Sequence, residues 1–102
     1  MSEEKRRELV WSALALQDLA EIRDRIATQN PKAARKQLHT LLKRAQQLTD
    51  FPNMGRAVPE LPGSTFRELI EGNYRLVYKV AETTVTIATV FEGHREFPMG
   101  NV

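Results

Sequence analysis

Apolar and polar residues alternate through most of the last third of the chain. A period of two is typical of β-strands, because successive side chains of a strand point to opposite faces of the sheet. The alternation predicts three antiparallel strands, at residues 65–70, 74–80 and 85–91. β-Branched and aromatic residues dominate all three, and Gly72-Asn73 interrupts the pattern between the first two.

The length of the loop between the first two strands decides which side chains share a face, since a slip of one residue turns all of them over. A three-residue loop at 71–73 places Ile70 opposite Tyr74. With a four-residue loop at 81–84, this register predicts one apolar face composed of Phe66, Ile70, Tyr74, Leu76, Tyr78, Val80, Val85, Ile87 and Phe91. A two-residue loop is rejected, because it would mix Arg67 into this aromatic set.

The opposite face of the predicted sheet mixes cations with apolar residues. In the same register its members are Arg67, Leu69, Arg75, Val77, Lys79, Thr86 and Ala88. No carboxylate of the strands joins them. We expect this face to stay uncovered and to meet another macromolecule.

Two amphipathic helices are predicted in the first half of the chain, because apolar residues recur there at intervals of three and four. Ser12 is placed to cap the first helix, and Asn30-Pro31 ends it and begins the second. The apolar stripes are Ala15, Leu19, Ile22 and Ile26 in the first helix and Ala34, Leu38, Leu41, Ala45 and Leu48 in the second. So short a connection gives an antiparallel helical hairpin, whose apolar side fits the apolar face of the sheet.

The remaining segments complete a fold of the α+β class. The apolar run 9–11 predicts one more strand, at an edge of the sheet or beside its last strand. Residues 50–63 contain three prolines and two glycines and are predicted to form a loop pinned to the body, with Arg56 holding it to Glu60 or Glu68. We therefore predict an N-terminal strand and an antiparallel helical hairpin packed on one face of a three- to four-stranded, mainly antiparallel sheet.

Composition narrows the functional classes without selecting one. The 102 residues fit a single domain, 1–102, in which 1–6 and 98–102 are expected to be flexible. Cysteine is absent, and no apolar run approaches the roughly 20 residues of a membrane helix. We therefore expect a cytoplasmic protein that does not enter a membrane. His39 and His94 lie too far apart in the sequence to suggest a metal site, and no cofactor is expected.

Six short motifs, in this order along the chain, resemble those of the ParE/RelE superfamily of bacterial toxins. They are WSALA at 11–15, NPKAA at 30–34, FPNMGR at 51–56, VPE at 58–60, RELI at 67–70 and NYRLVY at 73–78. The third motif and the last two are most similar to the ParE branch, whose members are often called plasmid stabilisation proteins.

This resemblance implies a toxin of a type II toxin–antitoxin system, neutralised by a cognate antitoxin in a hetero-oligomer. Members of the ParE branch poison DNA gyrase by binding it. Members of the RelE branch are metal-independent endoribonucleases that cleave mRNA on the ribosome. We expect inhibition of gyrase, with ribosome-dependent cleavage of mRNA as the alternative. A third reading is an inactive relative that only binds its antitoxin.

A RelE-like nuclease would need a base for the 2′-hydroxyl, cations for the charged transition state, and an acid for the leaving oxygen. Arg67 and Arg75 lie on adjacent strands of the expected open face and could hold a phosphate, while His94 could exchange a proton there. Arg95 is an auxiliary cation. The alternative is that these arginines are simply solvated. For binding of a target without cleavage, the candidates are Arg75, Lys79, His94 and Arg95.

An antitoxin needs apolar surface on the toxin, and exposed apolar strips on small proteins commonly mark partner sites. Leu14, Leu16 and Leu42 lie outside the two core stripes of the helices. Leu69 and Val77 interrupt the cations of the expected open face. We expect these five residues to bind the antitoxin.

The outer side of the second helix is strongly basic, with cations at Lys32, Arg35, Lys36, Lys43 and Arg44. These charges could neutralise phosphates of a nucleic acid. They could also hasten association with an acidic protein. The side lacks aromatic residues on which bases could stack, and a charged helical side is often only solvated.

Overall fold

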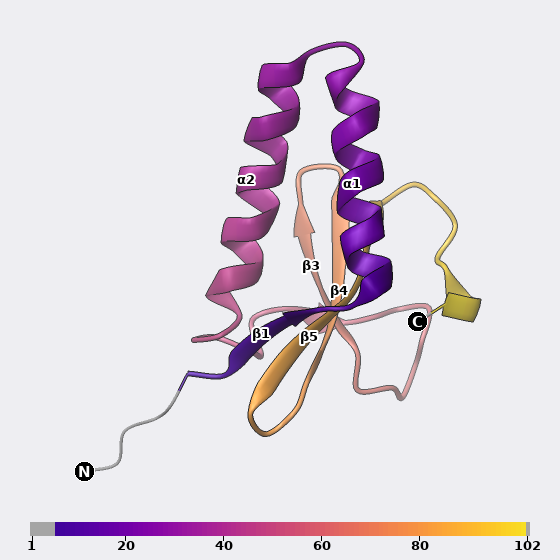
Figure 1. Cartoon of the computed structure of the whole chain (residues 1–102). Coiled ribbons are helices and arrows are strands. Elements are labelled where there is room, and N and C mark those ends of the chain that lie inside the picture. The colour runs from indigo at the N-terminus through magenta and orange to yellow at the C-terminus, as the bar shows by residue number, and fades with distance from the viewer. Residues whose placement is uncertain (1–5, 102) are drawn as a thin grey trace.

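The computed structural model describes residues 6–101, which form two layers, a helical hairpin and a five-stranded sheet (Figure 1). The elements are β1 (Glu8–Trp11), α1 (Ala13–Ala27), α2 (Pro31–Gln47), β2 (Arg56–Ala57), β3 (Arg67–Glu71), β4 (Tyr74–Val80), β5 (Thr84–Glu92) and the 3-10 helix η1 (Met99–Asn101). The strand order is β1-β5-β4-β3-β2, with β1 parallel to β5 and the other pairs antiparallel. The α+β prediction is confirmed, and the two-residue β2 adds a fifth strand to the three or four expected.

Both helices begin where the sequence predicts. The Oγ of Ser12 accepts a hydrogen bond from the Ala15 amide at 3.0 Å and donates one to the Ala88 carbonyl at 2.8 Å. The Oδ1 of Asn30 accepts from the Ala33 amide at 3.1 Å. Each side chain satisfies an amide that would otherwise lack a partner in the first turn, which fixes where the helix starts.

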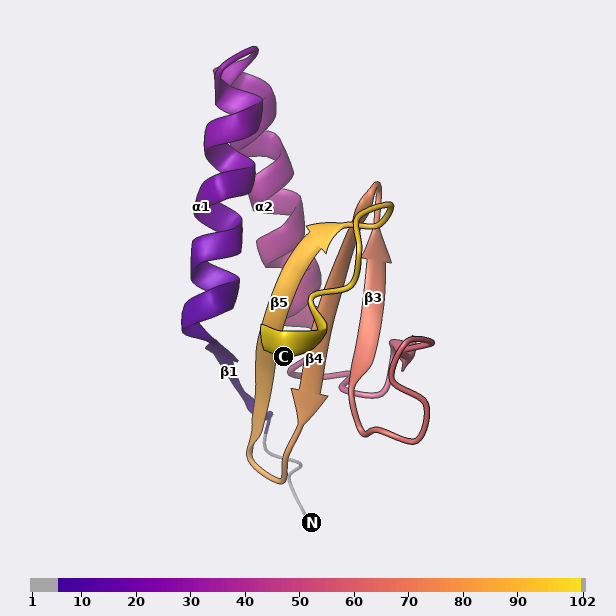
Figure 2. The ribbon, with the colours of Figure 1, turned by 90° about the vertical axis from the view of Figure 1, so that its right-hand side faces the viewer.

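The hairpin lies against one face of the sheet and buries the larger hydrophobic cluster of the molecule (Figure 2). The buried members of this helix-side cluster are Ala15, Leu19, Ile22, Leu41, Ala45, Leu48, Leu69, Tyr74, Leu76, Tyr78, Val85, Ile87 and Val90. Full burial of a large apolar side chain contributes about 1.5–3 kcal/mol relative to leaving it exposed. This cluster therefore provides most of the apolar stabilisation that holds the two layers together.

The predicted three-residue loop between β3 and β4 is wrong. The loop contains only Gly72 and Asn73, because Glu71 already pairs with Tyr74. Gly72 has a φ of 60°, which glycine adopts at no steric cost. A positive φ at the first of two loop residues is the requirement of a type II′ turn, whose twist matches that of the flanking strands.

The shorter loop turns over every side chain of β3. Leu69, predicted on the open face, is buried in the helix-side cluster. Phe66 and Ile70, predicted beneath the helices, lie on the opposite face, which we call the far face. Glu68 also lies on the far face, contrary to the prediction that no strand carboxylate does.

A bulge in β5 changes one more assignment. Ala88 is an extra residue between the partners of Val77 and Tyr78, so the alternation of β5 shifts at this point. Val90 consequently joins the helix-side cluster, whereas Phe91 turns to the far face. The prediction that Phe91 lies beneath the helices is therefore wrong.

The far face is not bare, contrary to the prediction. A second cluster covers it, with Val58, Val77, Phe91 and Phe97 buried and Leu61, Phe66 and Ala88 partly buried against them. Its cover comes from the loop after β2 and from the C-terminal segment, which crosses in front of β5 and β4 (Figure 2). We call this group the far-side cluster.

No helix within residues 6–101 is long and apolar enough to cross a membrane. The flexibility predicted for residues 1–5 and Val102 falls outside the described residues. Arg6 forms an ion pair with Asp50 at 2.8 Å, and residues 99–101 form η1.

Candidate functional site

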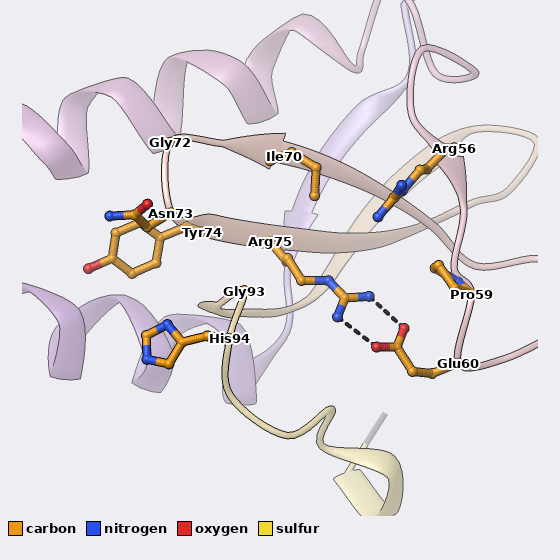
Figure 3. A pocket seen from close by; sticks show the side chains of 10 residues that line it. All are labelled: Arg56, Pro59, Glu60, Ile70, Gly72, Asn73, Tyr74, Arg75, Gly93 and His94. Carbon is orange, nitrogen blue, oxygen red and sulfur yellow. Dashed lines mark hydrogen bonds and ion pairs between the residues drawn. The ribbon is translucent and has the colours of Figure 1, made fainter.

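A hollow of about 470 Å³ opens on the far face, where the turn between β3 and β4 meets the end of β5 (Figure 3). Its walls come from the loop after β2, from the β3–β4 hairpin and from the segment that follows β5. The ionisable side chains that line it are Arg56, Glu60, Tyr74, Arg75 and His94.

Arg75 is only 8% exposed, and its guanidinium is almost fully engaged (Figure 3). Its Nη1 and Nη2 donate to the two carboxylate oxygens of Glu60 at 2.7 and 2.6 Å. Its Nε and Nη2 lie 2.8 and 2.6 Å from Oε1 of Glu68. The rings of Phe91 and Phe97 lie within cation–π distance, with their centroids 5.2 and 5.5 Å from Cζ.

The negative charges of Glu60 and Glu68 thus balance the positive charges of Arg75 and Arg56 at this site. Glu68, whose side chain is fully buried, also accepts from Nε of Arg56 at 2.7 Å, so a side-chain contact reinforces the pairing of β2 with β3. The hydrogen bonds from Arg75 lower the pKa of Glu60 from 4.5 to about 2. The same bonds raise the pKa of Arg75. The prediction that Arg56 holds the segment 50–63 to a carboxylate is confirmed for Glu68.

Arg67 and Arg75 lie on opposite faces of the sheet. Cross-strand partners share a face, and Arg67 pairs with Tyr78 whereas Arg75 pairs with Ile70. The Nη1 of Arg67 donates to the Gly55 carbonyl at 2.7 Å. The prediction that the two arginines share one open face and hold a phosphate together is therefore wrong.

The hydroxyl of Tyr78 fixes the loop before β2. It accepts from the Gly55 amide at 2.9 Å and donates to the Pro52 carbonyl at 2.7 Å. Burial raises the pKa of Tyr78, which keeps the hydroxyl protonated and able to donate. A Cβ on Gly55 would lie 2.5 Å from the carbonyl oxygen of Glu68, so only glycine fits here. The loop that leads to Glu60 is therefore positioned by the core itself.

Of the other predicted site residues, His94 lies at the hollow, whereas Arg95 and Lys79 do not. His94 lines it, but its ring points away from the guanidinium of Arg75 (Figure 3). Arg95 is exposed and borders a different depression, and Lys79 stands 5.4 Å from the centroid of the Phe66 ring. Within residues 6–101, no group of three or more His, Asp or Glu side chains lies close enough together to hold a metal ion.

Comparison with known proteins gives the family. A family model described as "ParE toxin of type II toxin-antitoxin system, parDE" matches residues 9–97. The chain belongs to the ParE toxin family. This confirms the resemblance of its motifs to the ParE/RelE superfamily and makes the chain a toxin of a type II toxin–antitoxin system.

Relatives of this ParE-family toxin carry names from both branches of the superfamily. Toxin RelE2 of Caulobacter vibrioides is 36% identical over 84 residues, which are 81% of this chain and 91% of that protein. The chromosomal ParDE toxin–antitoxin system of P. aeruginosa contains a chain with the same fold, at a TM-score of 0.73 and 23% identity, covering 84% of this chain and 95% of that one. A chain of the RelBE2 toxin–antitoxin complex of Mycobacterium tuberculosis shares the fold at a TM-score of 0.64 and 22% identity, covering 85% and 98%.

The apolar residues predicted to bind the antitoxin divide into two groups in this toxin. Leu16 and Leu42 are exposed on the helices. Leu14 lines an apolar hollow of about 370 Å³ beside β4 and β5. Leu69 and Val77 are buried on opposite faces of the sheet, so the prediction that they interrupt an open face is wrong.

Two residues at the centre of the site, Glu60 and Glu68, are absent from the set of candidates that the sequence suggests. The predicted register, which is wrong, assigns Glu68 to the helix side of the sheet and so leaves it out of the candidates. Glu60 lies in a loop, where no periodicity gives its direction. The one available signal is the VPE motif around Glu60, which takes part in the family resemblance.

Proposed function

We propose that this toxin inhibits DNA gyrase by binding it and does not cleave RNA. One observation carries the proposal, namely that the carboxylates of Glu60 and Glu68 bind all three guanidinium nitrogens of Arg75, the arginine of the predicted catalytic pair that lies on the far face. Membership of the ParE family supports gyrase as the target.

The chemistry of the hollow supports binding over cleavage. A general base works best when its pKa lies near the working pH, and the pKa of Glu60 is about 2. A cation stabilises the developing charge on a phosphate only if its donors are free to reach it, and those of Arg75 are taken. His94, the candidate acid, points away from both groups (Figure 3).

Two assays on the purified chain separate the functions. In a supercoiling assay we expect inhibition of gyrase and accumulation of cleaved DNA. In a ribosome assay we expect no new cuts in mRNA. His39→Ala, which changes the histidine outside the hollow, is the control for His94→Ala in the ribosome assay. Cuts in mRNA that disappear in His94→Ala but persist in His39→Ala would overturn the proposal.

The second candidate is ribosome-dependent cleavage of mRNA. One observation favours it, because Glu60, Arg75 and His94 line the same hollow and supply a carboxylate, a cation and an imidazole. The name of the Caulobacter relative, RelE2, points in the same direction. The ribosome assay above decides between the two.

We further propose that a cognate antitoxin binds the exposed leucines of the helical hairpin, in a hetero-oligomer. Leu16 and Leu42 are 55% and 44% exposed, although leucine is commonly buried. Both structural relatives come from toxin–antitoxin systems. The double variant Leu16→Glu/Leu42→Glu should lose co-purification with the antitoxin. The control Met99→Glu, at another exposed apolar residue, should retain it. Retention by both would contradict this assignment.

A further inference from the structure

The solvent-facing side of α2 carries a continuous line of basic residues. Lys32, Arg35, Lys36, His39 and Lys43 recur at intervals of three and four, so they lie on one side of the helix. All five are exposed. The buried residues of α2 lie on the other side of the helix. We call these five residues the basic stripe.

In the described part of the chain, the charges of this stripe are without carboxylate partners. The sequence of α2 contains no carboxylate between residues 31 and 47. Within residues 6–101, none of the four permanent cations of the stripe takes part in an ion pair. By contrast, Arg44 on the same helix pairs with Glu71 at 3.1 Å. A cluster of unpaired like charges raises the free energy of the isolated chain slightly, and a polyanion would relieve this repulsion.

The stripe is also accessible as a whole. The end of the hairpin that carries Lys32 extends beyond the sheet in both views (Figures 1 and 2). With a rise of about 1.5 Å per residue, Lys32 and Lys43 lie about 16 Å apart along the axis of α2. A rod of this length can follow several phosphates of a nucleic acid.

The residue types of the stripe favour duplex phosphates over other kinds of partner. Protein interfaces depend on buried aromatic and apolar anchors, and the stripe has none. Single-stranded nucleic acids are held by aromatic side chains on which bases stack, and these are missing as well. Lysines and an arginine without anchors match what contacts with the phosphates of a duplex require.

We propose that the basic stripe of α2 binds the phosphate backbone of duplex DNA. The choice of DNA rests on the proposed function, because a toxin that traps gyrase acts where duplex DNA passes through the enzyme. The stripe then holds the toxin against the DNA, while other surfaces meet the protein. Since it reads no bases, the binding is independent of sequence and sensitive to salt.

The test is fluorescence anisotropy with a labelled 20-base-pair DNA duplex and the full chain made by cell-free synthesis, without gyrase. Four cations predict a slope of about −3.6 in log K against log salt, at about 0.9 for each phosphate. The double variant K32Q/K36Q should halve the slope, to about −1.8, and weaken binding about tenfold or more at low salt. The matched control R6Q/R23Q, which removes two exposed cations outside α2, should bind within twofold of the unaltered chain.

Several results would overturn the inference. These are a slope near zero, equal losses in the two double variants, or tighter binding to a duplex RNA or to polyglutamate than to DNA. Failure here can be told from failure of the proposed function, because the binding assay contains no gyrase. Inhibition of gyrase without binding to DNA would overturn only the inference. Binding to DNA without inhibition of gyrase would overturn only the proposed function.

Discussion

The two faces of the sheet are both covered, but by different means. On one side regular helices present leucines, isoleucines and alanines to the helix-side cluster, which contains no charged residue. On the other side a loop and the C-terminal segment cover the far-side cluster, and a network of two arginines and two glutamates lies beside it. One face is stabilised by the burial of apolar surface, and the other also depends on ion pairs between arginines and glutamates.

The difference shows what irregular segments need in order to pack on a sheet. The backbone N–H and C=O groups of a loop are not paired with a neighbouring strand, so side chains must bind them and hold the loop in place. Tyr78 does this for Pro52 and Gly55, and Arg75 does it for Glu60. A buried ion pair is stabilising only when its remaining donors are used, as they are around Arg75.

The largest effect is expected where β4 faces the helices. Leu76 and Val77 are adjacent, both are fully buried, and they point to opposite faces. We expect Leu76→Ala to lower the free energy of unfolding by about 3–4 kcal/mol, the usual cost of a large cavity in a core. Val77→Ala, which removes two carbons instead of three, should cost about 2 kcal/mol. Urea denaturation measures both.

The pair of variants tests whether the far face is a true second core. Similar losses for each carbon removed mean that both clusters are packed to the same density. A cost below about 0.5 kcal/mol for Val77→Ala would mean that the loop and the C-terminal segment rest loosely on the sheet.

The next effect concerns the charges of the far face. In Glu68→Gln, Arg75 keeps only Glu60 as an anionic partner while it stays buried. We expect a loss of about 3 kcal/mol in the free energy of unfolding, because removal of one partner leaves a buried charge poorly compensated. Chemical denaturation at neutral pH measures it.

The control for this prediction is an ion pair of the same kind near the surface. Glu71 lies 3.1 Å from Arg44, and both side chains are more than a quarter exposed. Glu71→Gln should cost less than about 1 kcal/mol, because water already screens the pair. Equal losses for the two glutamine variants would remove the distinction between a buried network and a surface pair.

The helical hairpin could be predicted from the sequence because its signals are local. Apolar spacing of three and four gives the stripe of each helix, and Ser12 and Asn30 mark the first residues. The short link between the helices then leaves only a hairpin. Each step depends on neighbours within a few residues, and the structure confirms each one.

The far side could not be predicted, because two of its determinants are not local. The two-residue loop was rejected since it mixes Arg67 with aromatic residues, yet Arg67 reaches the edge of the sheet and donates to the Gly55 carbonyl. A long arginine side chain can lie along apolar surface and place its charge at the rim. The bulge at Ala88 leaves no clear signal in the alternation of β5 and still decides where Phe91 points.

The smallest expected effect is the dependence of stability on pH at Glu60. Its pKa is about 2 in the folded chain against an ordinary 4.5, so folding favours the carboxylate. The resulting stabilisation is fully present above pH 4.5 and is lost as the pH falls toward 2. Thermal midpoints of Glu60→Gln should therefore lie below those of the unaltered chain at neutral pH and converge with them over this window. A constant difference from pH 7 to pH 2 would show that Glu60 holds Arg75 by shape and not by charge.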